Sequence, residues 1–235
     1  MDQQTKAQIL LADHRGCSVL GGLRSFHTFN FGRYFDESRS PFGLLQVLND
    51  DSLQAEHSVR ITLNPTTEIV LLPIVGGLEL QINNEEPVFI ESGQLFHVQS
   101  VEAATLKITD PYPANEVNFL QLWLSSSQAP LSSTKTETIW FPIDSKNQLH
   151  PLFTSYGQTS KGWIGKYTLR SEGVLTYEEN TQGLFVFVIQ GAFEVQNRLL
   201  QPRDGLKLWN LQEALEFEAL SEDAILLVVE QQTCE

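Results

Sequence analysis

The histidines of this sequence are poorly spaced for a metal site. Iron or manganese centres need several imidazole or carboxylate donors that converge on one point and leave coordination positions open. No two histidines stand in the His-x-His or His-x-x-x-His spacing that puts two imidazoles on one face of a strand or a helix. A metal site would therefore have to draw its ligands from scattered loops. The five positions are His14, His27, His57, His97 and His150.

Motifs for other chemistries are also missing. The chain contains no G-x-G-x-x-G, no phosphate-binding loop, no G-x-S-x-G and no C-x-x-C. Its two cysteines, Cys17 and Cys234, stand at opposite ends. We expect two free thiols in a reducing cytoplasm, with a single bridge between them as the alternative.

Composition excludes some classes of partner. Lys and Arg number 15 and Asp and Glu number 29, so the net charge is -14. Such a surface repels phosphate backbones and anionic lipids, so we expect no direct nucleic-acid binding. No run of 18 uncharged apolar residues occurs, and residues 1–6 do not form a secretory signal, so we expect a cytoplasmic protein without a membrane span.

Almost all of the predicted elements that could position functional side chains are strands. The same order of strands and turns occurs twice in the chain. A continuous apolar run at 69–72 is followed by the turn Gly76-Gly77, an alternating strand at 78–82 and a second turn at Gly93. The second half repeats this order with a run at 184–189, then Gly191, residues 193–196 and Gly205. An internal repeat of about half the chain predicts two similar β domains, each a double-sheet jelly-roll barrel.

The domain boundaries are predicted from a change in composition. Residues 125–136 are rich in Ser, Thr and Pro, which is typical of a linker. We therefore predict an N-terminal domain at 1–126, a linker at 127–144 and a C-terminal domain at 145–235.

Three segments carry a resemblance to a known family. Residues 27–36, HTFNFGRYFD, resemble the pirin signature His-Thr-Phe-Ser-Phe-Gly, an aromatic pair and Asp. Residues 42–51, FGLLQVLNDD, resemble the family's Phe-Gly-x-Leu-x-Val-Ile-Asn-Asp-Asp, and FLQLWL at 119–124 is similar to the strand that closes the first cupin. The resemblance is close over residues 14–125. The remainder is similar only in pattern to the second cupin of bacterial, quercetinase-like pirins.

The resemblance implies an all-β fold of two cupin domains in tandem, a bicupin. It also implies a site in the N-terminal barrel where pirins hold iron or another divalent metal on three His and one Glu, and some members cleave quercetin with dioxygen. Counting from the family motifs, the ligand positions fall on Thr62, Asn64, Leu106 and Ile108, and a further family carboxylate falls on Glu68. None of the four matches a family ligand in type.

We therefore expect no metal cofactor and assign no catalytic residue. Thr and Asn oxygens are weak donors for such an ion, and Leu and Ile have none. The sequence allows two alternatives for the place where the family holds its metal. Either it is a pocket lined by Thr62, Asn64, Leu106, Ile108 and the carboxylate of Glu68, or the two apolar side chains fill it.

Three functions are compatible with these residues. The favoured one is a pirin-like bicupin without enzymatic activity, which binds a small organic ligand as a sensor or binds a protein partner. The second is a quercetin 2,3-dioxygenase-like enzyme with a rearranged or weak metal site. The third is a metal-independent cupin enzyme such as an isomerase.

Overall fold

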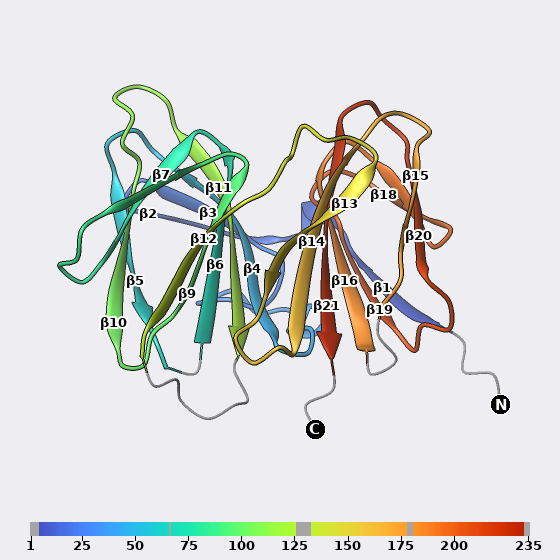
Figure 1. Cartoon of the computed structure of the whole chain (residues 1–235), viewed down its shortest axis with the longest axis horizontal. Helices are drawn as coiled ribbons and strands as arrows, with labels where there is room; N and C mark the ends of the chain where they lie inside the picture. Colours follow the sequence, from blue (N-terminus) through green and yellow to red (C-terminus); the bar gives the residue numbers. More distant parts are fainter. Residues whose placement is uncertain (1–4, 66, 126–132, 178–180, 233–235) are drawn as a thin grey trace. The chain divides into compact units, whose positions relative to one another are not determined.

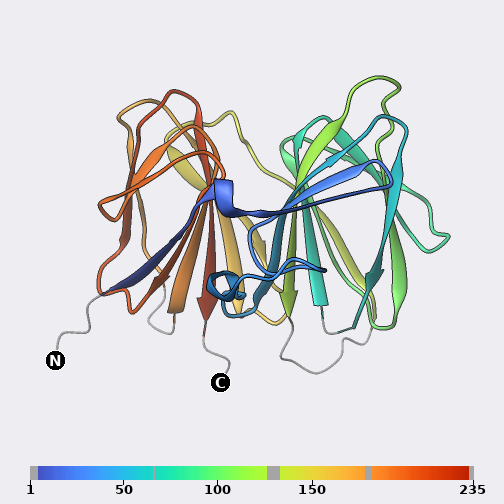
Figure 2. The same cartoon turned by 180° about the vertical axis from the view of Figure 1, so that it is seen from behind.

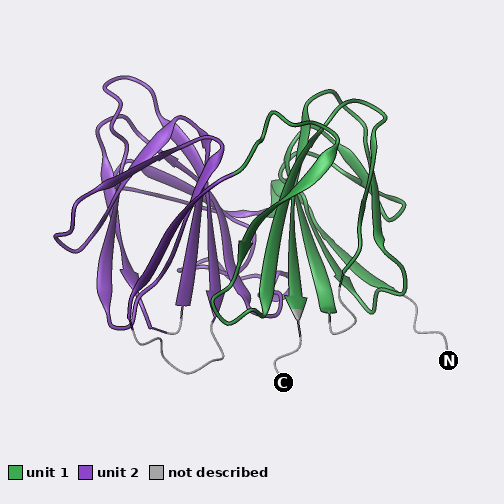
Figure 3. Ribbon diagram, viewed as in Figure 1, with its two compact units in different colours: residues 1–14, 141–235 green, residues 15–140 purple. Residues whose placement is uncertain are grey.

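Two compact units of β structure make up the chain (Figures 1 and 3). The computed structural model describes residues 5–65, 67–125, 133–177 and 181–232. Residues 15–140 form what we call the N-terminal unit, and residues 1–14 with 141–235 form the C-terminal unit. Within the described ranges helical structure is limited to two short 3-10 helices, η1 (Ala12–His14) and η2 (Glu37–Arg39). None of the helices in that part of the chain is long and apolar enough to cross a membrane.

The N-terminal unit consists of two antiparallel sheets with an apolar core between them. Its larger sheet has the strand order β12 (Lys135–Trp140), β9 (Gln94–Gln99), β6 (Thr67–Val75), β11 (Val117–Ser125), β4 (Leu45–Leu53), β3 (Leu23–His27) and β2 (Gly16–Leu20). Its smaller sheet has the order β5 (Ser58–Leu63), β10 (Ala104–Thr109), β7 (Gly77–Ile82) and β8 (Val88–Glu91).

The C-terminal unit has the same two-sheet architecture. Its larger sheet runs β1 (Lys6–Leu10), β19 (Gly205–Trp209), β16 (Thr181–Gln190), β21 (Ala224–Gln232), β14 (Ser160–Tyr167) and β13 (Gln148–Thr154). Its smaller sheet runs β15 (Glu172–Leu175), β20 (Leu215–Ala219), β17 (Phe193–Val195) and β18 (Arg198–Leu200).

Strand order confirms the internal repeat. The central order β9-β6-β11-β4 of one unit corresponds to β19-β16-β21-β14 of the other, and the small sheets correspond strand by strand. The turn glycines also correspond, because Gly76 and Gly191 both have positive φ, at 77° and 72°. A Cβ on Gly191 would lie 2.2 Å from Ser221 Oγ, so both conformation and space require glycine at this position. The prediction of two jelly-roll barrels in tandem is confirmed.

Alternation of side chains builds each core. In β10 the inward positions are Ala104, Leu106 and Ile108, while the residues between them are more exposed. β6 is buried on both faces, as its continuous apolar run predicts. Full burial of each leucine or isoleucine side chain stabilises the fold by about 1.5–3 kcal/mol, so these alternating positions dominate the energetics of the barrel.

The observed units differ from the predicted domain boundaries at two places. Strand β12 lies inside the predicted linker 127–144, yet it pairs with β9 along its whole length. Most of its residues are exposed, because an edge strand that contains Thr needs no apolar run. For this reason the composition of the segment indicates a linker although the segment forms a strand. Residues 126–132, which include the start of the predicted linker, lie outside the described residues.

The second difference is at the N-terminus, which was assigned to the first domain. Strand β1 pairs with β19 and so belongs to the C-terminal unit; Figure 2 shows it in blue beside orange strands. In each unit this outer place next to β9 or β19 is filled from outside the repeat, by β12 and by β1 respectively. Cys17 in β2 is an exposed free thiol, and Cys234 lies outside the described residues.

Candidate functional site

Thr62 and Asn64 do not line the interior of the N-terminal unit. Both side chains are exposed, and Thr62 lies opposite Thr105, which is also exposed. The inward positions of β5 are instead Ile61, which packs against the core, and Leu63, which is 1% exposed. Since a strand alternates its faces, the apolar pattern of β5 turns the two predicted pocket residues outward. The prediction that Thr62 and Asn64 line an interior pocket is therefore wrong.

Leu106 and Ile108 do face the interior, where they are 0% and 1% exposed. They belong to one continuous apolar cluster with Leu63 of β5 and Leu80 of β7. Of the two states left open by the sequence, the structure has the filled one at these positions. A pocket walled by Leu106 and Ile108 on one side and by Thr62 and Asn64 on the other does not form.

Glu68 lies on the opposite face of β6 from this cluster. Ile69 and Leu71 point into the core, so Glu68 points the other way. It is 1% exposed, and its Oε2 lies 2.9 Å from Nε2 of the fully buried His97. Glu68 therefore does not line a pocket with Leu106 and Ile108, as the sequence predicted, but pairs with His97, since buried polar side chains need such a partner.

The His97 partner was missed because the two residues are far apart in sequence. The sequence nevertheless contains a signal for this pair. Each stands out of phase with the inward apolar positions of its strand, Glu68 beside Ile69 and His97 between Phe96 and Val98. Once β6 and β9 are paired, both side chains must lie on the same face of the sheet.

The residues at the four implied ligand positions do not fit an iron, nickel or manganese ion. Two of them point outward and the other two carry no donor atoms. Across the described part of the chain, no three His, Cys, Asp or Glu side chains lie close enough together to hold a metal ion. The Glu68–His97 pair supplies two donors, which is fewer than a catalytic centre needs.

A polar layer interrupts the apolar interior further along the larger sheet. Asp51 of β4 lies opposite Phe119 of β11 and is 1% exposed. With the Gln121 amide oriented to satisfy both of its neighbours, its nitrogen donates to Asp51 Oδ2 at 2.8 Å and its oxygen accepts from Trp123 Nε1 at 2.6 Å. Burial raises the pKa of Asp51 to about 7, and the charge of Asp50 adds to this rise.

Asp50 has a different environment on the other face of β4. Its Oδ2 lies 3.1 Å from Arg15 Nη1, and its Oδ1 accepts from Asn118 Nδ2 at 2.8 Å. The two adjacent carboxylates therefore differ in their partners. Asp50 contacts a guanidinium, whereas Asp51 accepts from a neutral amide in a buried site.

Two surface depressions are candidates for contacts. One of about 540 Å³ lies in the N-terminal unit at the end of β6, lined by Val75, Gly76, Tyr112, Asn115, Glu116 and Val117. The other, of about 250 Å³, lies on the outer face of the small sheet of the C-terminal unit. It is acidic, because its walls include Glu172, Glu194, Glu216 and Glu218.

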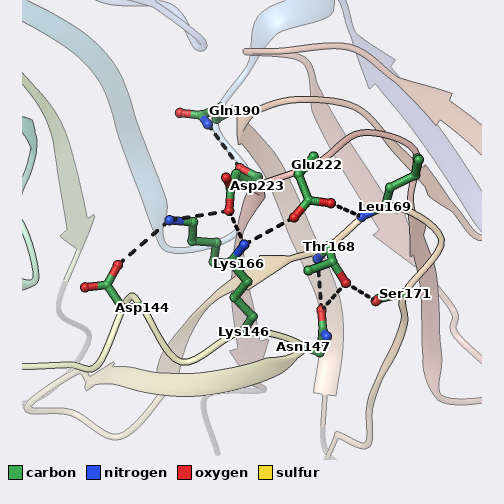
Figure 4. Close-up of polar contacts among 10 residues, drawn as sticks. All are labelled: Asp144, Lys146, Asn147, Lys166, Thr168, Leu169, Ser171, Gln190, Glu222 and Asp223. Atoms are coloured by element: carbon green, nitrogen blue, oxygen red, sulfur yellow. Dashed lines mark hydrogen bonds and ion pairs between the residues drawn. The ribbon is translucent and has the colours of Figure 1, made fainter.

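Figure 4 shows a charged cluster in the C-terminal unit. Lys146 Nζ lies 2.7 Å from Asp223 Oδ1 and 3.2 Å from Glu222 Oε1, and Glu222 also accepts from the Leu169 amide at 3.1 Å. Hydrogen bonds to Asp223 and Glu222 raise the pKa of Lys146. Because these side chains are exposed, such pairs contribute little to stability. The cluster joins three loops at the surface of this unit.

The placement of β5 predicts opposite responses at neighbouring residues. Leu63→Ala should lower the free energy of unfolding by about 2–5 kcal/mol, since it leaves a cavity in the core. Thr62→Ala should change it by no more than about 0.5 kcal/mol, since the side chain is exposed. Urea unfolding of the two variants measures both values. A large loss for Thr62→Ala with a small loss for Leu63→Ala would mean that the opposite face of β5 points inward.

The environment of Asp51 predicts a pH-dependent stability. The folded protein favours the protonated carboxyl, so its stabilising effect is complete below pH 4 and is lost as the pH rises to about 7. Asp51→Asn, which cannot ionise, should therefore gain stability over the wild type by about 1.4 kcal/mol per pH unit between pH 5 and pH 7. Urea unfolding across this range measures the difference. The exposed Asp13→Asn is the control, and a difference that does not vary with pH would contradict the prediction.

Comparison with known proteins agrees with this architecture. A family model described as the quercetinase C-terminal cupin domain matches residues 159–230. A relative from Zymomonas mobilis, whose name proposes quercetin 2,3-dioxygenase activity, is 26% identical over 93% of both chains. Quercetin 2,3-dioxygenase of Escherichia coli is 21% identical over 92% of this chain and 95% of its own.

Solved structures share the whole fold. The crystal structure of YhhW from Escherichia coli has a TM-score of 0.86 at 17% identity, covering 98% of this chain and 99% of the other. The bacterial pirin YhhW in complex with nickel(II) has a TM-score of 0.84 at 20% identity, covering 97% and 100%. The cupin match, the full-length relatives and the common two-barrel fold together show that this chain has the bicupin fold and is similar to bacterial pirins and quercetin 2,3-dioxygenases.

Proposed function

We propose that this pirin-like bicupin does not cleave flavonols and that it works as a binding module, with a protein as its main partner. The observation that carries the proposal is the interior of the N-terminal unit. At the positions that match the family's ligands, Thr62 and Asn64 point outward, and Leu106 belongs to the apolar core. Dioxygen activation by the family's metal has no ligand set to support it at these positions.

The filled interior favours a protein partner over a small organic ligand. Small-molecule sites are concave pockets of roughly 300–1,000 Å³ with a few converging polar groups. Here fully buried side chains such as Leu63, Leu80 and Leu106 pack together at that place. The exposed thiol of Cys17 supports a cytoplasmic location, since free thiols persist in a reducing compartment.

The competing function is a quercetin 2,3-dioxygenase with a rearranged metal site. What favours it is the similarity along the whole chain to proteins that carry this name. Its most plausible starting point is the Glu68–His97 pair, whose side chains meet at 2.9 Å. A third or fourth donor would have to come from a rearrangement of the neighbouring strands.

Metal content and flavonol cleavage distinguish these functions. After purification without chelators and dialysis, elemental analysis should find well below one transition metal ion per chain. During aerobic incubation with quercetin and added Fe, Mn, Ni or Cu, the flavonol absorbance should decrease no faster than in a control that contains the metal without the protein. A metal-dependent loss of absorbance that His97→Gln abolishes would establish the rearranged site instead.

A cavity variant tests the filled interior. In thermal-shift measurements with flavonols and small aromatic acids, the wild type should show no stabilisation. Leu106→Ala opens space in the core and serves as the matched variant that can admit a small apolar ligand. Ligand-induced stabilisation of the wild type that is lost on filling the site with Leu106→Phe would restore the small-molecule sensor.

A further inference from the structure

An exposed serine lies next to a buried histidine at the edge of the larger sheet of the N-terminal unit. Ser18 is on the edge strand β2 and is exposed, whereas His27 of β3 is 2% exposed. The strand register places Gly16 opposite His27 and Ser18 opposite Ser25. Asn49 of β4 lies opposite His27 on the other side and is 2% exposed.

Hydrogen bonds connect these three side chains in one line. Ser18 Oγ lies 3.0 Å from His27 Nε2, and His27 Nδ1 lies 3.0 Å from Asn49 Oδ1. Ser25 Oγ also lies 3.3 Å from His27 Nδ1. An amide oxygen can only accept and a hydroxyl can do so, so we assign the ring proton of His27 to Nδ1. Nε2 then carries a lone pair, and the Ser18 hydroxyl must be the donor.

The surroundings keep the imidazole neutral. Burial lowers the pKa of His27, the Asn49 hydrogen bond opposes this, and the positive charge of Arg15 lowers it further. A neutral imidazole that already accepts from a hydroxyl can take up that proton when the oxygen attacks.

We propose that Ser18 is a nucleophile activated by His27 as general base, with Asn49 as the group that orients the imidazole, and that it accepts acyl groups from activated esters. The arrangement of nucleophile, base and orienting side chain is the geometry that defines such sites on unrelated folds. It uses no metal and lies apart from the filled barrel positions, so it is independent of the function proposed above.

The step balances without a further reactant. Ser18 Oγ forms a bond to the ester carbonyl carbon while its proton moves to His27 Nε2. The bond from that carbon to the leaving oxygen breaks, and the proton passes from Nε2 to the departing alcohol or phenol. Water, deprotonated by His27 in the same way, can later release the acyl group as a carboxylic acid and restore the serine hydroxyl.

Aromatic side chains beside the imidazole indicate the class of acyl donor. The rings of Phe31 and Tyr34 lie 5.0 Å and 6.4 Å from the His27 ring, and both residues are half-buried. Phe31 also packs edge-on against Trp123 at 5.7 Å. Tyr34 covers Gly16, where an added Cβ would lie 2.3 Å from the ring. This apolar surface suits aryl esters, whose phenol leaving group needs little further stabilisation.

Serine-directed labelling tests the proposal. A fluorophosphonate probe should add one label per chain, and peptide mass mapping should place that label on Ser18. Ser18→Ala should lose the label, while Ser92→Ala, which removes another exposed serine, should keep it. p-Nitrophenyl acetate should give a burst of one phenol per chain in the wild type and none in Ser18→Ala.

The role of His27 is tested by the dependence of the labelling rate on pH. In the wild type the rate should rise with pH and level off below pH 7, because the pKa of His27 is lowered. His27→Gln should reduce the rate by about 10²–10⁴-fold and remove this inflection. Asn49→Asp should keep the label and move the inflection to higher pH, since a carboxylate stabilises the imidazolium.

Three results would overturn the proposal. These are labelling of wild-type protein at no more than the rate of Ser18→Ala, a label that maps to another residue, or a labelling rate for folded Asn49→Asp that has the wild-type inflection. Circular dichroism checks that each variant is folded. Because Ser18 is exposed, its alanine variant keeps the test decisive even if His27→Gln is destabilised.

Discussion

Alternation of side chains along a strand decides what the N-terminal barrel can hold. One residue of β5 in every two enters the interior, and here these are the apolar Ile61 and Leu63. On the neighbouring strand β10, Leu106 lies beside Ile61, and Ile108 enters the same core. Since interiors are packed as densely as organic crystals, these apolar side chains fill the space on this side of the barrel. The outward orientation of Thr62 and Asn64 is the other half of the same constraint.

Much of the architecture could be predicted from the sequence because it depends on local patterns. The apolar runs that became β6 and β16, and the glycine turns that follow them, are readable within a few residues. Strands β1 and β12 were harder, because an exposed edge strand lacks an apolar run. Their assignment depends on partners far away in the chain, which local patterns do not specify.

The candidate sites depended even more on distant pairing. Counting from family motifs located the equivalent positions, yet it could not say which face of β5 points inward. Glu68 was recognised as a notable carboxylate, but its partner His97 becomes visible only when β6 and β9 are placed side by side. Ser18, His27 and Asn49 belong to three strands, and nothing in their spacing links them before the sheet register is known.

The pairing of β1 with β19 has a consequence for synthesis on the ribosome. Lys6 lies opposite Trp209, so the strand made first must wait for one of the last strands before it can pair. The N-terminal unit spans residues 15–140 and can fold while translation continues. Until residues 205–209 emerge, residues 6–10 form an unpaired strand that could pair wrongly with a β edge of a neighbouring nascent chain. The order in which this chain is made thus opposes the order in which its second barrel can close.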